Sequence, residues 1–159
     1  PRQTVLVSCK AEIQSRFSPD KEEKDNLITL SWHSPVSKDP EMYAIMISKE
    51  RYSYKLIKES SVFVVNFMPI KYKDEVLYCG RNSGEHIDKF KETGLKKEGA
   101  EKVDCVRVKQ ALGYLECHVI QEVEAGDHVV IIGSVVNSVQ NKKGKKIFQV
   151  KGDKFTTTK

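Results

Sequence analysis

The sequence predicts a mostly β protein in which about seven antiparallel strands close into a barrel or a sandwich. The main evidence is a hydrophobic period of two, which recurs along most of the chain. Connections between apolar runs are short, as at residues 124–127, and strands joined this way pair antiparallel. The 159 residues, 39% of them apolar, suffice for one domain (1–159) with a real core.

Strands are expected wherever Val, Ile, Tyr, Phe and Thr cluster between turn residues. The expected ranges are residues 4–9, 27–32, 42–47, 62–68, 114–123, 128–139 and 146–150. Residues 20–25 are too polar to be buried and predict a loop. The serine- and proline-rich residues 34–40 predict a polar turn, and Gly144 among lysines predicts an exposed hairpin tip between two apolar strands.

A few short helices are expected between the strands. Residues 54–60 form the first, with Ser53 as its N-cap, and its start offers backbone N–H groups to an anion. Residues 72–81 form the second. Residues 87–93 form the third, which Gly94 ends in a left-handed conformation.

Composition excludes several classes of protein. No apolar run is long enough for a membrane span and no signal-peptide core is present, so a cytoplasmic location is expected. The four cysteines are widely spaced, which predicts reduced thiols, and the four histidines lack metal-ligand spacing. The phosphate loop, dinucleotide fingerprint, nucleophile elbow and zinc-protease motifs are all missing.

The positive charge is local. The chain carries +5, but the tail formed by residues 141–159 carries +6 and the other 140 residues sum to −1. A nucleic-acid role is disfavoured because no aromatic residues interleave with these lysines to stack on bases.

Residues 26–53 contain the best candidate binding site. Hydroxyl groups and one arginine lie beside the only tryptophan, Trp32, a combination that suits a phosphate carried on a flat aromatic group. The polar residues are Thr29, Ser31, Ser34, Ser37, Ser48, Arg51 and Ser53. The alternative is a purely structural polar turn between two strands.

Several short motifs in order resemble the flavin reductase-like family, in particular its flavoredoxin branch. They are Asn26 with residues 27–32, Ser34-Pro35-Val36-Ser37 with Asp39-Pro40, Arg51 and Ser53, Asn66, Asp88-Lys89-Phe90, Leu115-Glu116-Cys117 and Gly126-Asp127-His128. The resemblance runs from about Thr4 to about Gly144 and implies a split β-barrel that binds FMN at a homodimer interface.

The resemblance also implies the cofactor-binding residues. The ring would lie along one strand, and the ribityl chain and phosphate along the turn that follows the next strand. Matched positions are Asn26, Thr29, Leu30, Ser31, Trp32, Ser48, Arg51, Tyr52, Ser53, Lys89, His128 and Phe155.

Three of these positions carry further expectations. A cation at Lys89 near the pyrimidine ring would favour reduced flavin, although it could instead solvate a helix face. Trp32 would pack on the ring or else plug the barrel. Phe155 would cover the ring from the tail, with Phe148 as a competitor, and His128 is the one candidate for a catalytic role.

The expected function is therefore that of an FMN-dependent oxidoreductase. Electrons or hydride would pass through FMN between NAD(P)H or a redox protein and an acceptor, and no metal is required. The alternative is a cofactor-free β-barrel binding module that uses its lysine-rich tail on nucleic acid or an acidic protein.

Overall fold

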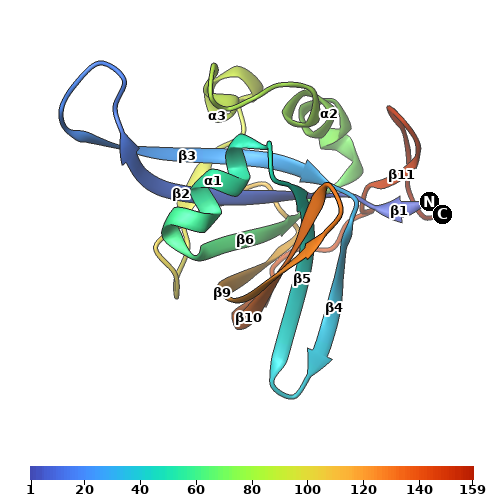
Figure 1. Ribbon diagram of the computed structural model, residues 1–159. Helices are drawn as coiled ribbons and strands as arrows, with labels where there is room; N and C mark the ends of the chain where they lie inside the picture. Colours follow the sequence, from blue (N-terminus) through green and yellow to red (C-terminus); the bar gives the residue numbers. More distant parts are fainter.

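Seven strands form one antiparallel sheet in the computed structural model, which describes all 159 residues (Figure 1). The order is β3-β2-β6-β9-β10-β5-β4. The bounds are β2 Val5–Gln14, β3 Lys21–Leu30, β4 His33–Lys38, β5 Glu41–Ser48, β6 Val62–Phe67, β9 Gly113–Ala125 and β10 His128–Gln140. The two edge strands, β3 and β4, are consecutive in sequence. Trp32 lies in the short link between them, and its carbonyl accepts a hydrogen bond from Met46 N–H of β5. The predicted antiparallel split barrel is confirmed.

The barrel interior is filled by alternate residues of the strands, as the period of two predicts. Sixteen buried apolar side chains form its core, among them Val7, Ile45 and Phe63. Helix α1 (Tyr52–Ser60) closes one side of this core with Leu56 and Ile57. Gly133 leaves room for Phe63, whose Cζ would lie 2.7 Å from a β-carbon at that position.

The other helices cover the outer face of β2 and β3 (Figure 1). A 3₁₀ turn, η1 (Ile70–Tyr72), precedes α2 (Lys73–Arg81), and α3 (Lys89–Thr93) follows. The Asp88 side chain accepts a hydrogen bond from Lys91 N–H and caps α3, and Gly94 ends that helix with φ 72°. The three predicted helices and the Gly94 cap are therefore confirmed.

Five short strands lie outside the main sheet, and only the one at residues 148–151 was predicted, as part of the strand expected at residues 146–150. β1 (Arg2–Gln3), β11 (Phe148–Lys151) and β12 (Lys154–Thr156) form a separate three-stranded sheet in the order β1-β11-β12. This sheet brings the two ends of the chain together (Figure 1). β7 (Lys97–Gly99) pairs with β8 (Val106–Val108). None of the helices is long and apolar enough to cross a membrane.

Two segments predicted as loops or turns are strands. Residues 21–25 belong to β3 and pair with β2 along its whole length. Their polar side chains are tolerated because they form ion pairs, such as Lys10 with Glu23 and Lys97 with Asp25. Residues 34–38 belong to β4 and pair with β5, so the turn lies later, at residues 39–40.

The predicted lysine-rich hairpin tip at Gly144 is also wrong. β10 and β11 do not pair with each other, and residues 141–145 form an irregular segment. The N–H groups of Asn141 and Lys142 donate to the Leu112 carbonyl, while the Lys145 carbonyl accepts from Ile70 N–H. Tertiary hydrogen bonds thus replace the expected hairpin.

Candidate functional site

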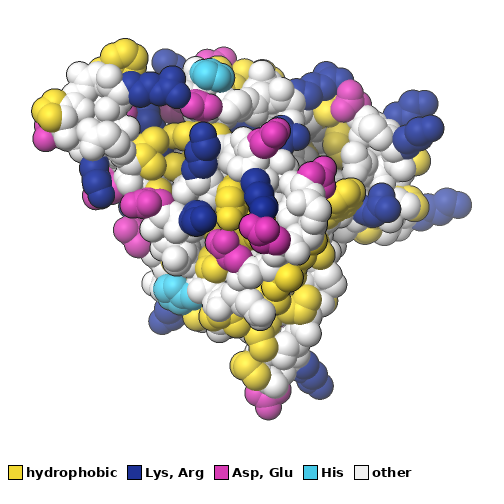
Figure 2. Space-filling model, viewed as in Figure 1, with side chains coloured by type: hydrophobic (Ala, Val, Ile, Leu, Met, Phe, Trp, Pro, Cys, Tyr) yellow, Lys and Arg dark blue, Asp and Glu magenta, His cyan; other side chains and the backbone are white.

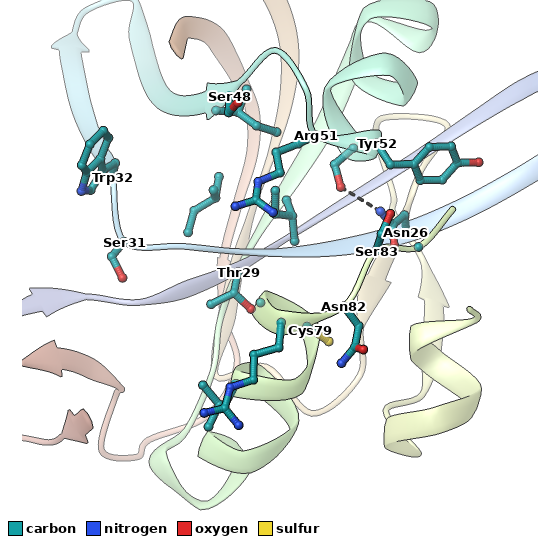
Figure 3. Close-up of a pocket in the computed structure, with 18 of the residues that line it drawn as sticks. Asn26, Thr29, Ser31, Trp32, Ser48, Arg51, Tyr52, Cys79, Asn82 and Ser83 are labelled. Atoms are coloured by element: carbon teal, nitrogen blue, oxygen red, sulfur yellow. Dashed lines mark hydrogen bonds between the residues drawn. The ribbon is translucent and has the colours of Figure 1, made fainter. Parts of the chain in front are cut away.

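A cavity of about 420 Å³ lies where the ends of β3 and β5 meet the start of α1, the end of α2 and the β11–β12 hairpin (Figure 3). Every cofactor-binding residue expected from the sequence lines it. These are Asn26, Thr29, Leu30, Ser31, Trp32, Ser48, Arg51, Tyr52, Ser53, Lys89, His128 and Phe155. The structure therefore brings together residues that are up to 129 positions apart in the sequence.

Hydroxyl groups at the end of β3 and directly after it anchor the cavity wall. Thr29 Oγ1 donates to the Val76 carbonyl of α2 at 2.5 Å, and Ser31 Oγ lies 2.8 Å from Thr4 Oγ1. Ser34 and Ser37, which the sequence grouped with them, do not line the cavity because they lie on β4 beyond it. Strand pairing rather than a turn accounts for those two serines.

Asn26 ties β3 to α1 at the deep end of the cavity. Its side chain is only 2% exposed, and Nδ2 donates to Ser53 Oγ at 2.8 Å. Gly84 lies directly against this amide, since a β-carbon there would be 2.0 Å from Asn26 Oδ1. Asn26 Oδ1 has no hydrogen-bond partner. The close approach of the backbone at residue 84 to the Asn26 amide requires glycine at this position.

The start of α1 faces the cavity with Arg51 as its N-cap. Arg51 provides no side-chain cap, and the first turn of the helix holds no acidic residue. The predicted N-cap role of Ser53 is therefore wrong, because Ser53 lies inside the helix and its hydroxyl bonds Asn26. The positive end of the helix dipole and the guanidinium group both favour an anion at this point.

Lys89 is a buried cation at the same end of the cavity. It is 4% exposed, and Nζ donates to the carbonyls of Leu27 and Cys79, each at 2.7 Å. Burial lowers the pKa of Lys89, and the charge of Arg51 lowers it further. Lys89 therefore does not solvate a helix face. One of its three N–H donors remains available for a ligand.

Trp32 and His128 form the opposite, aromatic end. Their ring centroids are 4.9 Å apart with an interplanar angle of 38°. Trp32 is 51% exposed, so it does not plug the barrel. His128 opens β10 as expected, and its Nδ1 lies 2.7 Å from Asp127 Oδ1. This hydrogen bond lowers the pKa of Asp127.

Sequence reasoning missed one wall of the cavity and most of another. The first is the end of α2 and the loop after it, Gly80-Arg81-Asn82-Ser83-Gly84. The second is the β11–β12 hairpin, where Phe155 was expected but Gln149, Gly152 and Asp153 were not. Arg81 joins the walls through an ion pair with Asp153. The run of small and donor residues after a predicted helix was the available clue for the first wall. Phe155 lines the cavity and Phe148 does not.

The four cysteines are unpaired and buried, which confirms the prediction of reduced thiols. Only Cys79 lines the cavity, and burial raises its pKa to about 11. At neutral pH this thiol is protonated and is a poor nucleophile. The wall at Cys79 is therefore structural.

The cavity can hold an elongated ligand with two different ends. In Figure 3, Trp32 and Ser31 lie at one end, whereas Asn26, Ser83 and Asn82 gather at the other and Arg51 points into the space between. Leu30 and Met46 add apolar surface. Such a donor set and volume suit a small molecule with a flat ring and an anionic group.

Comparison with known proteins gives the same family as the motifs. The family model described as the flavin reductase like domain matches residues 1–157. An uncharacterized protein of Archaeoglobus fulgidus is 34% identical over 115 residues, which are 72% of this chain and 65% of that protein. The matched parts of the first three curated relatives are 65%, 40% and 63% of their lengths, so this chain spans only part of each.

Solved structures share the fold at low sequence identity. An FMN-binding protein of Thermus thermophilus with bound 1-cyclohex-2-enone is 20% identical, with a TM-score of 0.85 over 99% of this chain and 86% of that one. Flavoredoxin of Desulfovibrio vulgaris (Miyazaki F) is 21% identical, with a TM-score of 0.83 over 100% and 87% of the two chains. Because the family model covers nearly the whole chain, this protein belongs to the flavin reductase-like domain family.

Proposed function

We propose that the chain binds FMN in the cavity and acts as a redox flavoprotein. The observation that carries this proposal is the division of one cavity into an aromatic end at Trp32 and a cationic end lined by Arg51 and Lys89. Figure 3 shows Trp32 at one end and Arg51 pointing into the cavity. FMN has the same division, with a flat ring system at one end and a phosphate at the other. Membership of the flavin reductase-like family supports the assignment.

The cationic end would bind the phosphate. Arg51 offers a planar guanidinium group, Lys89 a third N–H donor, and Ser48 a hydroxyl group, while the start of α1 adds its dipole. Lys89 lies near Arg51 at this end, which favours a role beside the phosphate over the expected role beside the pyrimidine ring. Its lowered pKa would return toward the ordinary value when a phosphate is near.

The aromatic end would bind the ring. Trp32, Leu30 and Met46 offer apolar surface, and Phe155 approaches from the tail. FMN, when bound, would supply reversible electron transfer that no side chain in the cavity can perform. His128 is held by Asp127 through Nδ1, so its Nε2 is the group best placed to hold or pass a proton at this end.

A homodimer is part of the proposal. Exposed apolar side chains lie on strands β4, β9 and β10, and Figure 2 shows hydrophobic surface on the lower projection, which β4 and β5 form in Figure 1. The residues are Val36, Ile120, Val123 and Val136. A second copy would remove this surface from water. Light scattering after size exclusion would give twice the chain mass, and a monomer would contradict the dimer.

The first experiment is an absorbance spectrum of the purified protein. A flavin spectrum that dithionite bleaches is expected, and chromatography of the released flavin should identify FMN. A colourless protein that FMN does not restore would contradict the proposal and favour the cofactor-free binding module. Released FAD would contradict the choice of FMN.

The phosphate assignment is tested by replacing Arg51 and Ser48, two of the groups assigned to the phosphate, with alanine together. Since hydrogen bonds to charged groups contribute about 1.5–3 kcal/mol each, FMN affinity should fall at least about a hundredfold. The control is Lys102→Ala with Ser138→Ala, two exposed positions that do not line the cavity, which should leave affinity unchanged. Equal affinity in the two double variants would refute the assignment.

Two electron donors remain to be distinguished. A reductase would take hydride from NADH or NADPH, whereas a carrier would exchange electrons with a protein. Anaerobic mixing with each nucleotide, followed at the flavin band, separates them. Bleaching within seconds supports the reductase, and a stable flavin band supports the carrier.

A further inference from the structure

A second cleft lies outside the candidate flavin site, and all of its charged lining residues are lysines. It has a volume of about 770 Å³ and lies between η1, the end of β8 and the irregular segment 141–145. Six of its twelve lining residues are lysines, and none is acidic. The lysines are Lys71, Lys96, Lys109, Lys142, Lys143 and Lys145.

These ammonium groups are largely uncompensated. Lys109 is the one member with an acidic partner, Glu98, at 3.7 Å, and Glu98 is shared with Arg107 at 2.6 Å. Lys142 Nζ donates to the Lys109 carbonyl. The side chains of the remaining four form no hydrogen bond or ion pair. Like charges placed together repel, so an anionic partner would relieve a real cost.

The backbone of this cleft is fixed before any partner arrives. Hydrogen bonds to the Leu112 carbonyl hold residues 141 and 142, and the Lys145 carbonyl accepts from Ile70 N–H at 2.8 Å. Gly144 packs against Leu112, since a β-carbon there would lie 2.7 Å from Leu112 Cδ2. The lysines are therefore presented from a rigid platform, which lowers the entropic cost of docking.

We propose that this lysine cleft is the docking site of a small acidic electron-transfer protein. The proposal rests on the redox function proposed above, because it names the partner with which the flavin site exchanges electrons. One helix connects the two sites, since Tyr72 at the start of α2 lines the cleft and Cys79 near its end lines the cavity. Nine helical residues span about 14 Å.

The composition of the cleft favours a protein over other polyanions. Lysines act as point charges and steer an approaching acidic surface, whereas specific phosphate sites commonly use arginine forks, and no arginine lines the cleft. Tyr72 is its only aromatic residue, which is too few for a stacking platform for nucleic-acid bases. The apolar floor of Ile70 and Leu112 suits a shallow protein contact.

The test measures binding to a plant-type [2Fe–2S] ferredoxin, used as a small acidic probe protein, by titration calorimetry. The cleft variant carries Lys96→Glu, Lys143→Glu and Lys145→Glu. The side chains of these three lysines form no hydrogen bond or ion pair, so their replacement should not impair folding. The control variant carries Lys55→Glu, Lys91→Glu and Lys102→Glu, exposed positions outside the cleft, and has the same net charge. A Lys→Gln version of the cleft variant serves if charge reversal impairs folding.

We expect wild-type binding that weakens as salt rises, at least about a tenfold loss of affinity in the cleft variant and little loss in the control. No binding by the wild type, or equal loss in both variants, would overturn the proposal. Tripolyphosphate or an oligothymidylate that binds more tightly than ferredoxin, and loses affinity in the cleft variant, would also overturn it. Ferredoxin binding is measured both with and without added FMN. If the protein binds ferredoxin but does not bind FMN, the result refutes the proposed redox function and not the docking site.

Discussion

Replacing Gly84 with alanine should disrupt the cationic end of the cavity without touching any charged group. A β-carbon at position 84 would lie 2.0, 2.4 and 2.8 Å from Oδ1, Cγ and Nδ2 of Asn26. Atoms do not approach so closely, so the amide must rotate away. Its hydrogen bond to Ser53 Oγ, at 2.8 Å, would then be lost.

The magnitude follows from two costs. Overpacking a buried site destabilises by about 1–3 kcal/mol, and a lost buried hydrogen bond adds about 1 kcal/mol. A total of about 2–4 kcal/mol lowers the Tm of a domain of this size by about 4–16 °C. The assay is chemical and thermal unfolding of four proteins in a double-mutant cycle: wild type, Gly84→Ala, Asn26→Ala and the double variant.

The cycle isolates the clash. Asn26→Ala removes all three contacted atoms, so Gly84→Ala should cost about 2 kcal/mol less in that background than in wild type. Gly99→Ala is the matched control, because nothing lies within 4 Å of a β-carbon there. Strictly additive free energies, or a Gly84 variant as stable as the Gly99 variant, would show that the amide does not constrain residue 84.

Three further predictions concern titration and the second wall of the cavity. Because the native state holds Lys89 with a pKa below its ordinary 10.5, the unfolded chain binds this proton more tightly, so the contribution of Lys89 to the free energy of unfolding rises as pH rises toward 10.5. The buried thiols have raised pKa values and lower stability over the same range in every variant, so the measurement is the difference between wild type and Lys89→Met in urea unfolding at about pH 8 and about pH 10, which should shift in favour of wild type at the higher pH. Burial lowers the pKa of His33 from 6.5, so stability should fall as pH drops below 6.5, and an unchanged fall in His33→Phe would contradict this origin. Arg81→Ala removes the exposed ion pair with Asp153 and should speed FMN release by about two- to fivefold in a stopped-flow assay, an effect that high salt should abolish.

The strands of the barrel were predictable because each has one buried face. Residues 62–68 and 128–139 alternate or are fully buried, and both form the expected strands. Residues 21–25 were not predictable, because that part of β3 extends away from the core and its pairing is visible only in the backbone. The prediction of a turn at residues 34–38 was wrong for a similar reason. Val36 and its neighbours on β4 are exposed, so their polarity does not alternate as it would in a half-buried strand.

From residue types alone, the candidate site was predictable only within residues 26–32 and 48–53, two short stretches whose predicted members the structure places in the cavity. Lys89, His128 and Phe155 were expected only through the family resemblance, and they line the cavity as well. The loop 80–84 enters because α2 packs on β3, and the β11–β12 hairpin because it pairs with β1. The lysine cleft arises in the same way, since its members come from four separated stretches of the chain. Tertiary packing, not local pattern, determines these neighbours.

The two ends of the cavity are supported differently, and this decides how substitutions there should behave. At the cationic end, Asn26 joins β3 to α1, and Lys89 joins α3 to the carbonyls of Leu27 in β3 and Cys79 in α2. Lys89, which is assigned to the phosphate, therefore also stabilises the fold, and its removal should change stability together with affinity. Trp32 is half exposed, and its main aromatic neighbour is His128. Substitutions of Trp32 should therefore change ligand binding with little effect on stability.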